Sequence, residues 1–345
     1  MENKKKIKLK ETDWYSEEYY GKNLFYRILA EKYEIENSEN PDYVLAGPCG
    51  YDHLKFNDAV KIYVTGECVC PDFNLFDYAV SFEHIQFGDR HLRYPLWLQY
   101  SDEMNRAMET KHLDVTEQMA KREFCAFVVS NGSIAESFRE KLFDALSEYK
   151  SVASGGRYRN NIGKPDGVED KIEFQKNYKF TIACENCSHE GYTTEKLVEA
   201  FASKTIPIYW GDPRICETFN PKSFINCNDY SSIEEIVAVI KEIDQNDELY
   251  LSMLRTPALL REEDRKEVQS KKIYEFLYHI FEQEKEDAYR RNRTYWGKHY
   301  SNIISDGNNA LKNEKARLQR WQRILKPYNW LKGFYKKYIK CRKNN

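Results

Sequence analysis

Short runs of β-branched and aromatic residues recur along the chain and are separated by segments with helical spacing of their apolar positions. Strands that alternate with helices indicate βαβ units and therefore parallel sheet. The sequence thus predicts an α/β fold. The runs expected to form strands are 43–46, 61–65, 78–82, 124–129, 180–184 and 205–210.

Two helices have recognisable starts. Ser133 and Glu136 form a capping-box pattern ahead of an apolar stripe, which predicts a helix over 133–149. A second helix is predicted to begin at Thr193 or Thr194 and to lead into the strand at 205–210.

The polar stretch 101–122 divides the pattern into two α/β halves, and at roughly 150 residues per domain the length of 345 residues also suggests two. We expect Rossmann-like domains at 1–122 and at 123–289, followed by a tail at 290–345. Two such halves bind their ligand in the cleft between them, beyond the carboxyl ends of the strands. Functional residues are therefore expected in loops that follow strands.

Composition excludes several classes of protein. With 41% hydrophobic and 31% charged residues the chain can bury a sizeable core and is not generally disordered. No run approaches the 18 apolar residues of a membrane span, and no hydrophobic signal core follows the start, so the expected location is the cytoplasm. Nine cysteines are then expected as reduced thiols. Cys68 with Cys70, and Cys184 with Cys187, lack a second pair at zinc-finger spacing, so a zinc site is disfavoured.

The net charge of −2 is distributed unevenly. From Arg290 onward the chain has 16 lysines and arginines against two acids, whereas residues 1–289 have 37 basic and 53 acidic residues. A basic arm favours an anionic partner, either nucleic acid or a membrane surface. Apolar residues share one helical face of the tail before Pro327 and recur at every fourth position after it, which predicts two short amphipathic segments. Such segments favour an anionic bilayer. Packing of this stripe on the protein or on a second subunit is the alternative. The stripe consists of Leu311, Leu318, Trp321 and Leu325, then Trp330, Phe334 and Tyr338.

The segment 180–211 is the richest in candidate chemistry. Glu185 and Asn186 follow a strand, and a helix begins at Thr193-Thr194-Glu195-Lys196, so a helix N-terminus and a lysine are available to a phosphate group. In the preceding loop, SGGRYRNNIGK, Gly155 and Gly156 allow close approach of the backbone and three basic residues supply positive charge. Helix capping and solvated charge are the alternative explanations. The motifs of dinucleotide enzymes, P-loop NTPases and α/β-hydrolases are absent from the sequence.

Four motifs in register resemble the α1,3/α1,4-fucosyltransferase family, especially its soluble bacterial members. They are VTGECVCPDFNLFDYAVSF followed by RYPLWL, then SGGRYRNNIG, EGYTTEKLVEAFASKTIPIYWGDP and FNPKSFIN. The resemblance covers roughly residues 55–260. It implies a GT-B fold with two Rossmann-like domains, an inverting mechanism and GDP-fucose as the donor.

The resemblance also implies roles for particular residues. Glu67 matches the general base that removes a proton from the acceptor hydroxyl, although by spacing alone it is a solvated turn carboxylate. Arg159 and Lys196 match the groups that bind the donor diphosphate. The sequence contains no Asp-x-Asp triplet, so donor binding is expected to need no metal ion and no cofactor. The other matches on the donor side are Glu185, Asn186, Tyr192 and Glu195.

The implied reaction moves L-fucose from GDP-fucose to a hydroxyl of GlcNAc in a Gal-GlcNAc (Lewis-type) acceptor, with α1,3 linkage. A GT-B transferase that uses another nucleotide sugar is one alternative. A nucleic-acid-binding protein that uses the basic tail is another, and the acidic body disfavours it. The expected partners are GDP-fucose, the acceptor glycan and an anionic membrane surface, with the protein peripheral on the inner face of the membrane and no nucleic acid bound.

Overall fold

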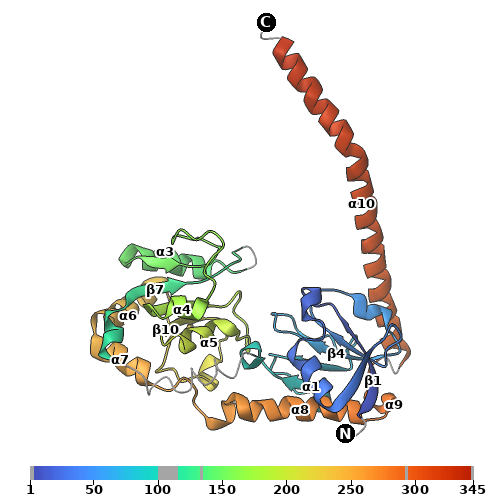
Figure 1. Ribbon diagram of the computed structural model, residues 1–345, viewed down its shortest axis with the longest axis horizontal. Coiled ribbons are helices and arrows are strands. Elements are labelled where there is room, and N and C mark those ends of the chain that lie inside the picture. The colour runs from blue at the N-terminus through green and yellow to red at the C-terminus, as the bar shows by residue number, and fades with distance from the viewer. Residues whose placement is uncertain (1–3, 100–115, 133–134, 292–293, 343–345) are drawn as a thin grey trace.

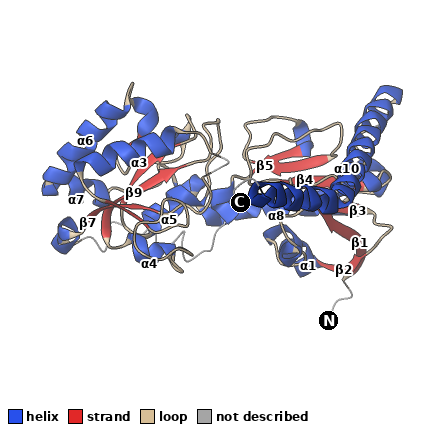
Figure 2. Ribbon diagram, turned by 90° about the horizontal axis from the view of Figure 1, so that it is seen from above, coloured by secondary structure: helices blue, strands red, loops and turns tan. Residues whose placement is uncertain are grey.

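The computed structural model describes residues 4–99, 116–132, 135–291 and 294–342. Two parallel β-sheets, each with helices on its faces, lie side by side along the long axis of the molecule (Figure 1 and Figure 2). The expected α/β class is confirmed, and each of the six predicted strands is present within two residues of its expected bounds.

The first sheet has six parallel strands in the order β2-β1-β3-β4-β5-β6. Its central strands are buried along their whole length, as is usual for parallel sheet covered on both faces. The strand order changes direction between β1 and β3, and an α/β sheet forms its ligand crevice at the carboxyl ends of two such neighbours. The strands are β1 (Lys5–Thr12), β2 (Tyr33–Asn37), β3 (Tyr43–Ala46), β4 (Val60–Val64), β5 (Tyr78–Ser81) and β6 (His91–Arg93).

The second sheet has five parallel strands in the order β11-β10-β9-β7-β8. Here the direction changes between β7 and β9, so the crevice of this sheet forms where β9 ends. The residue that follows β9 is Glu185. The strands are β7 (Glu123–Phe127), β8 (Val152–Ser154), β9 (Tyr178–Cys184), β10 (Ile206–Trp210) and β11 (Ile225–Asn226).

The helices differ from the sequence prediction at two places. Helix α3 begins at Phe138 rather than at 133, because the backbone N–H of Glu136 donates to the carbonyl of Asn186 (2.8 Å) instead of entering a helix. The predicted capping box is therefore wrong at Glu136, and Ser133 lies outside the described residues. The tail forms one continuous helix through Pro327 rather than two segments. The α-helices are α1 (Leu24–Lys32), α3 (Phe138–Tyr149), α4 (Lys171–Gln175), α5 (Glu195–Ala202), α6 (Ile233–Gln245), α7 (Asp247–Arg255), α8 (Lys266–Glu282), α9 (Lys285–Ala288) and α10 (Tyr295–Arg342).

Short 3₁₀ helices lie in the connecting loops, and one of them, Leu96–Gln99, joins the two units. The ring of Trp97 packs on that of Phe219 of the second unit at 5.2 Å between centroids. One continuous hydrophobic cluster therefore extends from the first sheet to α5. The others are Glu17–Tyr19, Asp52–Lys55, Gly88–Arg90, Glu117–Lys121, Ile215–Glu217, Cys227–Asp229 and Glu262–Asp264.

Helix α8 lies within the range predicted for the second domain, yet it packs beneath the first sheet (Figure 1). The hydroxyl of Tyr274 donates to Glu31 of α1 (2.7 Å), and that of Tyr278 donates to the carbonyl of Ile28 (3.3 Å). The buried face of α8 joins the core of β1 and β2. In space, the first unit thus includes a segment from far along the chain.

Two arginines assigned by sequence to the tail belong to this first unit. The guanidinium of Arg291 pairs with the carboxylate of Asp77, and both side chains are 0% exposed. Asp77 also accepts hydrogen bonds from the backbone N–H groups of Arg290 (2.7 Å) and Lys61 (2.7 Å). The chain is therefore anchored to β4 and β5 immediately before α10 begins.

The first turns of α10 pack on the first unit, and the rest projects away from the body (Figure 1). The hydroxyl of Tyr300 donates to Asp72 (2.9 Å), and Ile304 packs against the core beside β3. Farther along, Leu311, Leu318 and Trp321 are more than half exposed. Among the residues that the structure describes, no helix has the length and apolar character that crossing a bilayer requires.

Candidate active site

Glu67 follows β4 in a tight turn with Thr65 and Gly66. The Thr65 hydroxyl accepts from the backbone N–H of Glu67 (3.0 Å) and donates to its carbonyl (3.0 Å). A Cβ at Gly66 would meet the side chain of Leu96 at 2.8 Å, so glycine lets this turn lie close to Leu96 without moving it. The turn therefore holds Glu67, half-buried, where the units meet.

A cavity of about 470 Å³ is lined by both units at this place. Its wall on the first unit includes Glu67 and the aromatic side chains that follow β1, and Glu195 of α5 contributes from the second unit. The structure thus brings Glu67 and Glu195, which are far apart in sequence, to one cavity.

Glu185, at the end of β9, organises the N-terminus of α5. Its carboxylate is 0% exposed and accepts from the backbone N–H (2.7 Å) and the hydroxyl (2.6 Å) of Thr194, and from the ammonium of Lys196 (3.1 Å). Since these groups satisfy Glu185 completely within the protein, its role is to position α5 and Lys196. One N–H of the helix terminus is consequently not available to an anion.

Lys196 lies between two carboxylates. Its ammonium contacts Glu195 (3.2 Å) as well as Glu185. Burial alone would lower the pKa of Lys196, but the two carboxylates raise it, so Lys196 is charged at neutral pH. Burial favours a raised pKa for Glu195, but Lys196 and Lys171 outweigh burial and lower it. Glu195, which lines the cavity, is therefore an ionised carboxylate beside a fixed cation.

Tyr192 and Asn186 contact the protein around this cluster. Tyr192 is buried, and its ring packs edge-on against Phe82 of the first unit at 5.2 Å. The side-chain oxygen of Asn186 accepts from the buried guanidinium of Arg139 (3.0 Å). Both residues thus hold the loop after β9 in place.

Arg159 contacts α3 rather than the residues around Lys196. Its guanidinium forms a bidentate ion pair with Asp144 of α3 and lies over the ring of Phe143, 5.1 Å from the centroid. No contact among the described residues links Arg159 to Glu185, Thr194 or Lys196. Its φ of 54° is unusual for a residue with a side chain, and such strain often marks functional loops. To bind a diphosphate, Arg159 must exchange Asp144 for the phosphate.

Sequence reasoning missed two buried charged residues that shape the site. Arg139 lies on the apolar stripe of α3 with Leu142 and Leu146, and a charge on such a stripe was the available signal. Asp212, directly after β10, accepts from the backbone N–H groups of Gly191 (2.8 Å) and Arg214 (2.8 Å). Gly191 has a φ of 81°, so Asp212 stabilises the turn that leads into α5.

The cysteines do not form the two pairs that their spacing suggests. Burial, and then the nearby Cys187 of the second unit, raise the pKa of the Cys68 thiol to about 12. Cys184 is buried in the second core, and the eight cysteines from Cys49 to Cys227 are free thiols. Within the described ranges, no three His, Cys, Asp or Glu side chains are placed to hold a metal ion.

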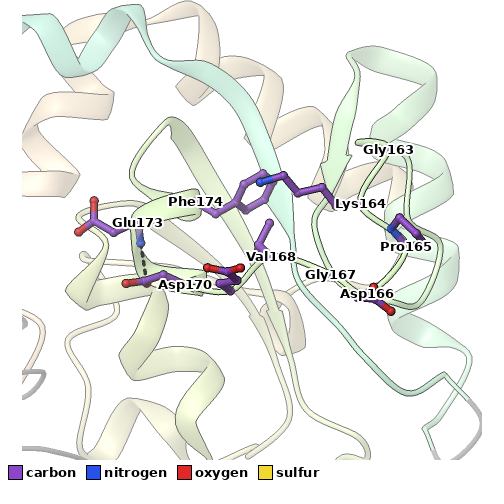
Figure 3. A pocket seen from close by; sticks show the side chains of 10 residues that line it. Gly163, Lys164, Pro165, Asp166, Gly167, Val168, Asp170, Glu173 and Phe174 are labelled. Atoms are coloured by element: carbon purple, nitrogen blue, oxygen red, sulfur yellow. Dashed lines mark hydrogen bonds between the residues drawn. The ribbon is translucent and has the colours of Figure 1, made fainter.

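A second pocket lies on the second unit, along the loop that follows Arg159 (Figure 3). Its volume is about 820 Å³ and it is lined by residues 163–170 with Glu173 and Phe174. Four carboxylates and one lysine line it, and Asp170 accepts from the backbone N–H of Glu173 (3.0 Å) to cap α4. Because the lining is acidic, this pocket disfavours an anionic group such as a diphosphate.

Comparison with known proteins bears on these observations. Residues 10–100 match the family described as "Alpha-(1,3)-fucosyltransferase FucT N-terminal domain", and residues 118–293 match "Glycosyltransferase family 10 (fucosyltransferase) C-term". The chain is 33% identical over 290 residues to "Alpha-(1,3)-fucosyltransferase FucT" of Helicobacter pylori, covering 72% of this chain and 59% of that protein. It therefore spans less than two thirds of the length of this curated relative.

A solved α1,3-fucosyltransferase structure with GDP-fucose superposes with a TM-score of 0.69 at 30% identity, covering 82% of this chain and 93% of that one. The human "4-galactosyl-N-acetylglucosaminide 3-alpha-L-fucosyltransferase 9" is 34% identical over 140 residues, which is 40% of this chain and 38% of that protein. The expected GT-B fold is thus confirmed. Both units match the family models in the same order along the chain, and the matched segments contain Glu67, Glu185 and Lys196. The chain therefore belongs to glycosyltransferase family 10, the fucosyltransferases.

Proposed function

We propose that this chain transfers L-fucose from GDP-fucose to a hydroxyl of GlcNAc in a Gal-GlcNAc-type acceptor, forming an α1,3 linkage with inversion. The observation that carries the proposal is the cavity that Glu67 lines from one unit and Glu195, beside Lys196, lines from the other. The names of the relatives, which include α1,3-fucosyltransferases and an enzyme acting on 4-galactosyl-N-acetylglucosaminide, support the linkage and the acceptor. The similar solved structure with GDP-fucose supports the donor.

The proposed chemistry assigns one task to each wall of the cavity. The Glu67 carboxylate takes the proton of the acceptor hydroxyl, whose oxygen attacks C1 of fucose from the face opposite the diphosphate. The bond between C1 and the diphosphate oxygen breaks, and GDP leaves with the electron pair. Lys196 compensates the negative charge that develops on the diphosphate. Attack on one face with departure from the other inverts the configuration at C1.

We also propose that donor binding needs no metal ion, since the Lys196 ammonium and the N-terminus of α5 supply positive charge at the cavity. The test is a panel of GDP-fucose, GDP-mannose and UDP-sugars, each with N-acetyllactosamine and excess EDTA, followed by linkage analysis of the product. We expect transfer only from GDP-fucose, at the same rate with and without EDTA. Transfer from another donor would support the alternative transferase, and rescue by manganese would contradict metal independence.

Replacement of Lys196 by methionine should weaken GDP binding about tenfold to a hundredfold, because a charge-assisted contact contributes about 1.5–3 kcal/mol. Calorimetric titration with GDP in EDTA measures this change. Lys176→Met, which removes an exposed lysine paired with Glu173, is the matched control and should bind GDP normally. Unchanged affinity in Lys196→Met would remove Lys196 from the donor site.

The tail supports a second proposal, reversible docking on an anionic bilayer. Leu311, Leu318 and Trp321 are exposed on a helix that leaves the body, and the residues from 314 onward include 11 lysines and arginines with one acid. Each basic residue near anionic lipid contributes about 1 kcal/mol, and salt screens this attraction.

We expect a chain that ends at Asn313 to stay folded and active on soluble acceptors and to lose co-sedimentation with phosphatidylserine vesicles. This truncation keeps Arg291 and the packed turns around Tyr300, which a cut at Arg290 would remove. Neutral vesicles and high salt are the controls. If the full chain does not bind anionic vesicles at low salt, the docking proposal is wrong and the apolar stripe packs on another surface, such as a second copy of the chain.

A further inference from the structure

One wall of the active-site cavity has no role in the chemistry proposed above. It consists of aromatic side chains on the segment that leaves β1: Trp14, Tyr15 and Tyr19. This segment begins at the carboxyl end of β1, next to β3, where the order of the first sheet changes direction. Parallel sheets form their ligand crevice at this point, so the wall lies where the fold of the first unit provides a binding site.

The backbone fixes the start of this segment. Asp13 has a φ of 62°, in the left-handed region that side chains disfavour. Its buried carboxylate accepts from the backbone N–H groups of Asp52 (2.8 Å) and His53 (3.0 Å), which hold the strained residue in place. At the end of β3, a Cβ on Gly47 would meet the ring of Trp14 at 2.7 Å. Strain that several contacts maintain at a strand end is characteristic of a functional turn.

The two tyrosines of this wall present their rings to solvent. Tyr15 is 65% exposed and Tyr19 is 52% exposed, although both line the cavity that contains Glu67. Exposed aromatic surface that gathers at a cavity indicates a binding surface rather than core. Burial, and then the nearby Glu67 carboxylate, raise the pKa of Tyr15. Tyr15 and Glu67 line the same cavity, so the ring lies beside the proposed base.

The position of the wall selects its ligand. The diphosphate of a nucleotide sugar requires positive charge, which the Lys196 ammonium supplies on the second unit. The tyrosines lie on the opposite side with Glu67, where the attacking hydroxyl must be. Lys22 and Arg27 line the same cavity with exposed side chains and can donate hydrogen bonds to sugar hydroxyls. An aromatic ring flanked by donors is suited to a neutral pyranose, whose C–H face is apolar and whose edge is polar.

We propose that Tyr15 and Tyr19 form the acceptor platform, on which the C–H face of a β-galactoside stacks while its GlcNAc hydroxyl reaches Glu67. That the bound sugar is the acceptor rests on the proposed function. Binding of a glycan to this surface can be tested without turnover. Tyr15 has a second task as a positioning residue, because its hydroxyl can donate to the Glu67 carboxylate, which lines the same cavity.

The test measures sugar binding and catalysis separately in four variants. In GDP-saturated protein, Tyr15→Ala and Tyr19→Ala should each raise the Kd for N-acetyllactosamine about tenfold or more, because each removes one stacking surface. Both variants should leave the Kd for GDP unchanged. Tyr15→Phe should keep the sugar affinity and lower kcat severalfold, since it retains the ring and loses the hydroxyl. Tyr51→Ala is the matched control, a 56% exposed tyrosine of the same unit outside this cavity.

Saturation-transfer NMR with N-acetyllactosamine, and with a maltose control, provides the binding readout for the full chain. The platform is overturned if the wild type binds no N-acetyllactosamine, or if both alanine variants bind it as the wild type does. If the wild type binds the sugar, the alanine variants lose it and no fucose is transferred, the platform stands and the proposed function is wrong. A Tyr15→Phe variant with unchanged kcat removes the positioning task alone.

Discussion

Glu67→Gln is expected to lower kcat by about 10² to 10⁴, because glutamine keeps the shape and polarity of the side chain but cannot accept the proton of the acceptor hydroxyl. The Thr65 hydroxyl holds the backbone of Glu67, not its carboxylate, so the turn should be retained in the variant. Affinity for GDP should hardly change, since Glu67 lines the cavity from the first unit and Lys196 belongs to the second. Single-turnover fucose transfer and GDP calorimetry measure the two quantities.

Glu36→Gln is the matched control for this variant. Glu36 is also a carboxylate of the first unit, but it pairs with Lys6 at the surface of the sheet, so its replacement should leave turnover unchanged. Near-normal turnover in Glu67→Gln would show that Glu67 is not the base. A loss of GDP affinity without a loss of turnover at saturating donor would place Glu67 on the donor side.

Arg291→Met is expected to destabilise the protein by about 3–5 kcal/mol, because it leaves the carboxylate of Asp77 buried without its charge partner. Chemical denaturation monitored by circular dichroism measures this change. Lys312→Met removes an ion pair with Asp52 whose two side chains are about half exposed, and such pairs contribute about 0–1 kcal/mol. If Arg291→Met is no more destabilising than Lys312→Met, residues before α10 do not anchor the chain as proposed.

Lys61 provides a second readout of the same buried cluster. Burial, and then the charge of Arg291, lower the pKa of Lys61 to about 7, whereas an unfolded lysine has a pKa near 10.4. Between these values the unfolded chain binds the extra proton, so the free energy of unfolding should rise with pH from about 7 to about 10. Removing Arg291 should raise the folded pKa of Lys61 and thereby reduce this slope. An unchanged slope in Arg291→Met would contradict the coupling.

Several features of this fold follow from local sequence. The central strands are continuous apolar runs, and parallel strands buried on both faces require such runs, so β3, β9 and β10 were predicted closely. The remaining strands were missed for the same reason. Lysines occupy alternate positions of β1, and β8 and β11 are only three and two residues long, so little apolar pattern marks them. The motifs around Glu67 and Lys196 were sufficient to identify the family.

Part of the site is also evident from sequence, because Glu185 and Lys196 are attached to one strand–helix connection. Their contact depends on a short loop and the start of α5, and local spacing determines both. Arg159 shows where this reasoning ends. Its loop was predicted correctly as a feature of the second unit, but its orientation toward Asp144 depends on packing against α3.

Only the tertiary structure decides how distant segments combine. Helix α8 and Arg291 belong to the first unit, although more than 170 residues separate them from its last strand. The reason is that Asp77 and the lower face of the sheet are buried, and their partners come from this distant part of the chain. Likewise Tyr15 and Glu67 meet because β1 and β4 end at the same edge of a parallel sheet, and Glu195 joins them only when the two units pack. Sequence determines which residues are available, whereas long-range burial and charge pairing determine which of them share a cavity.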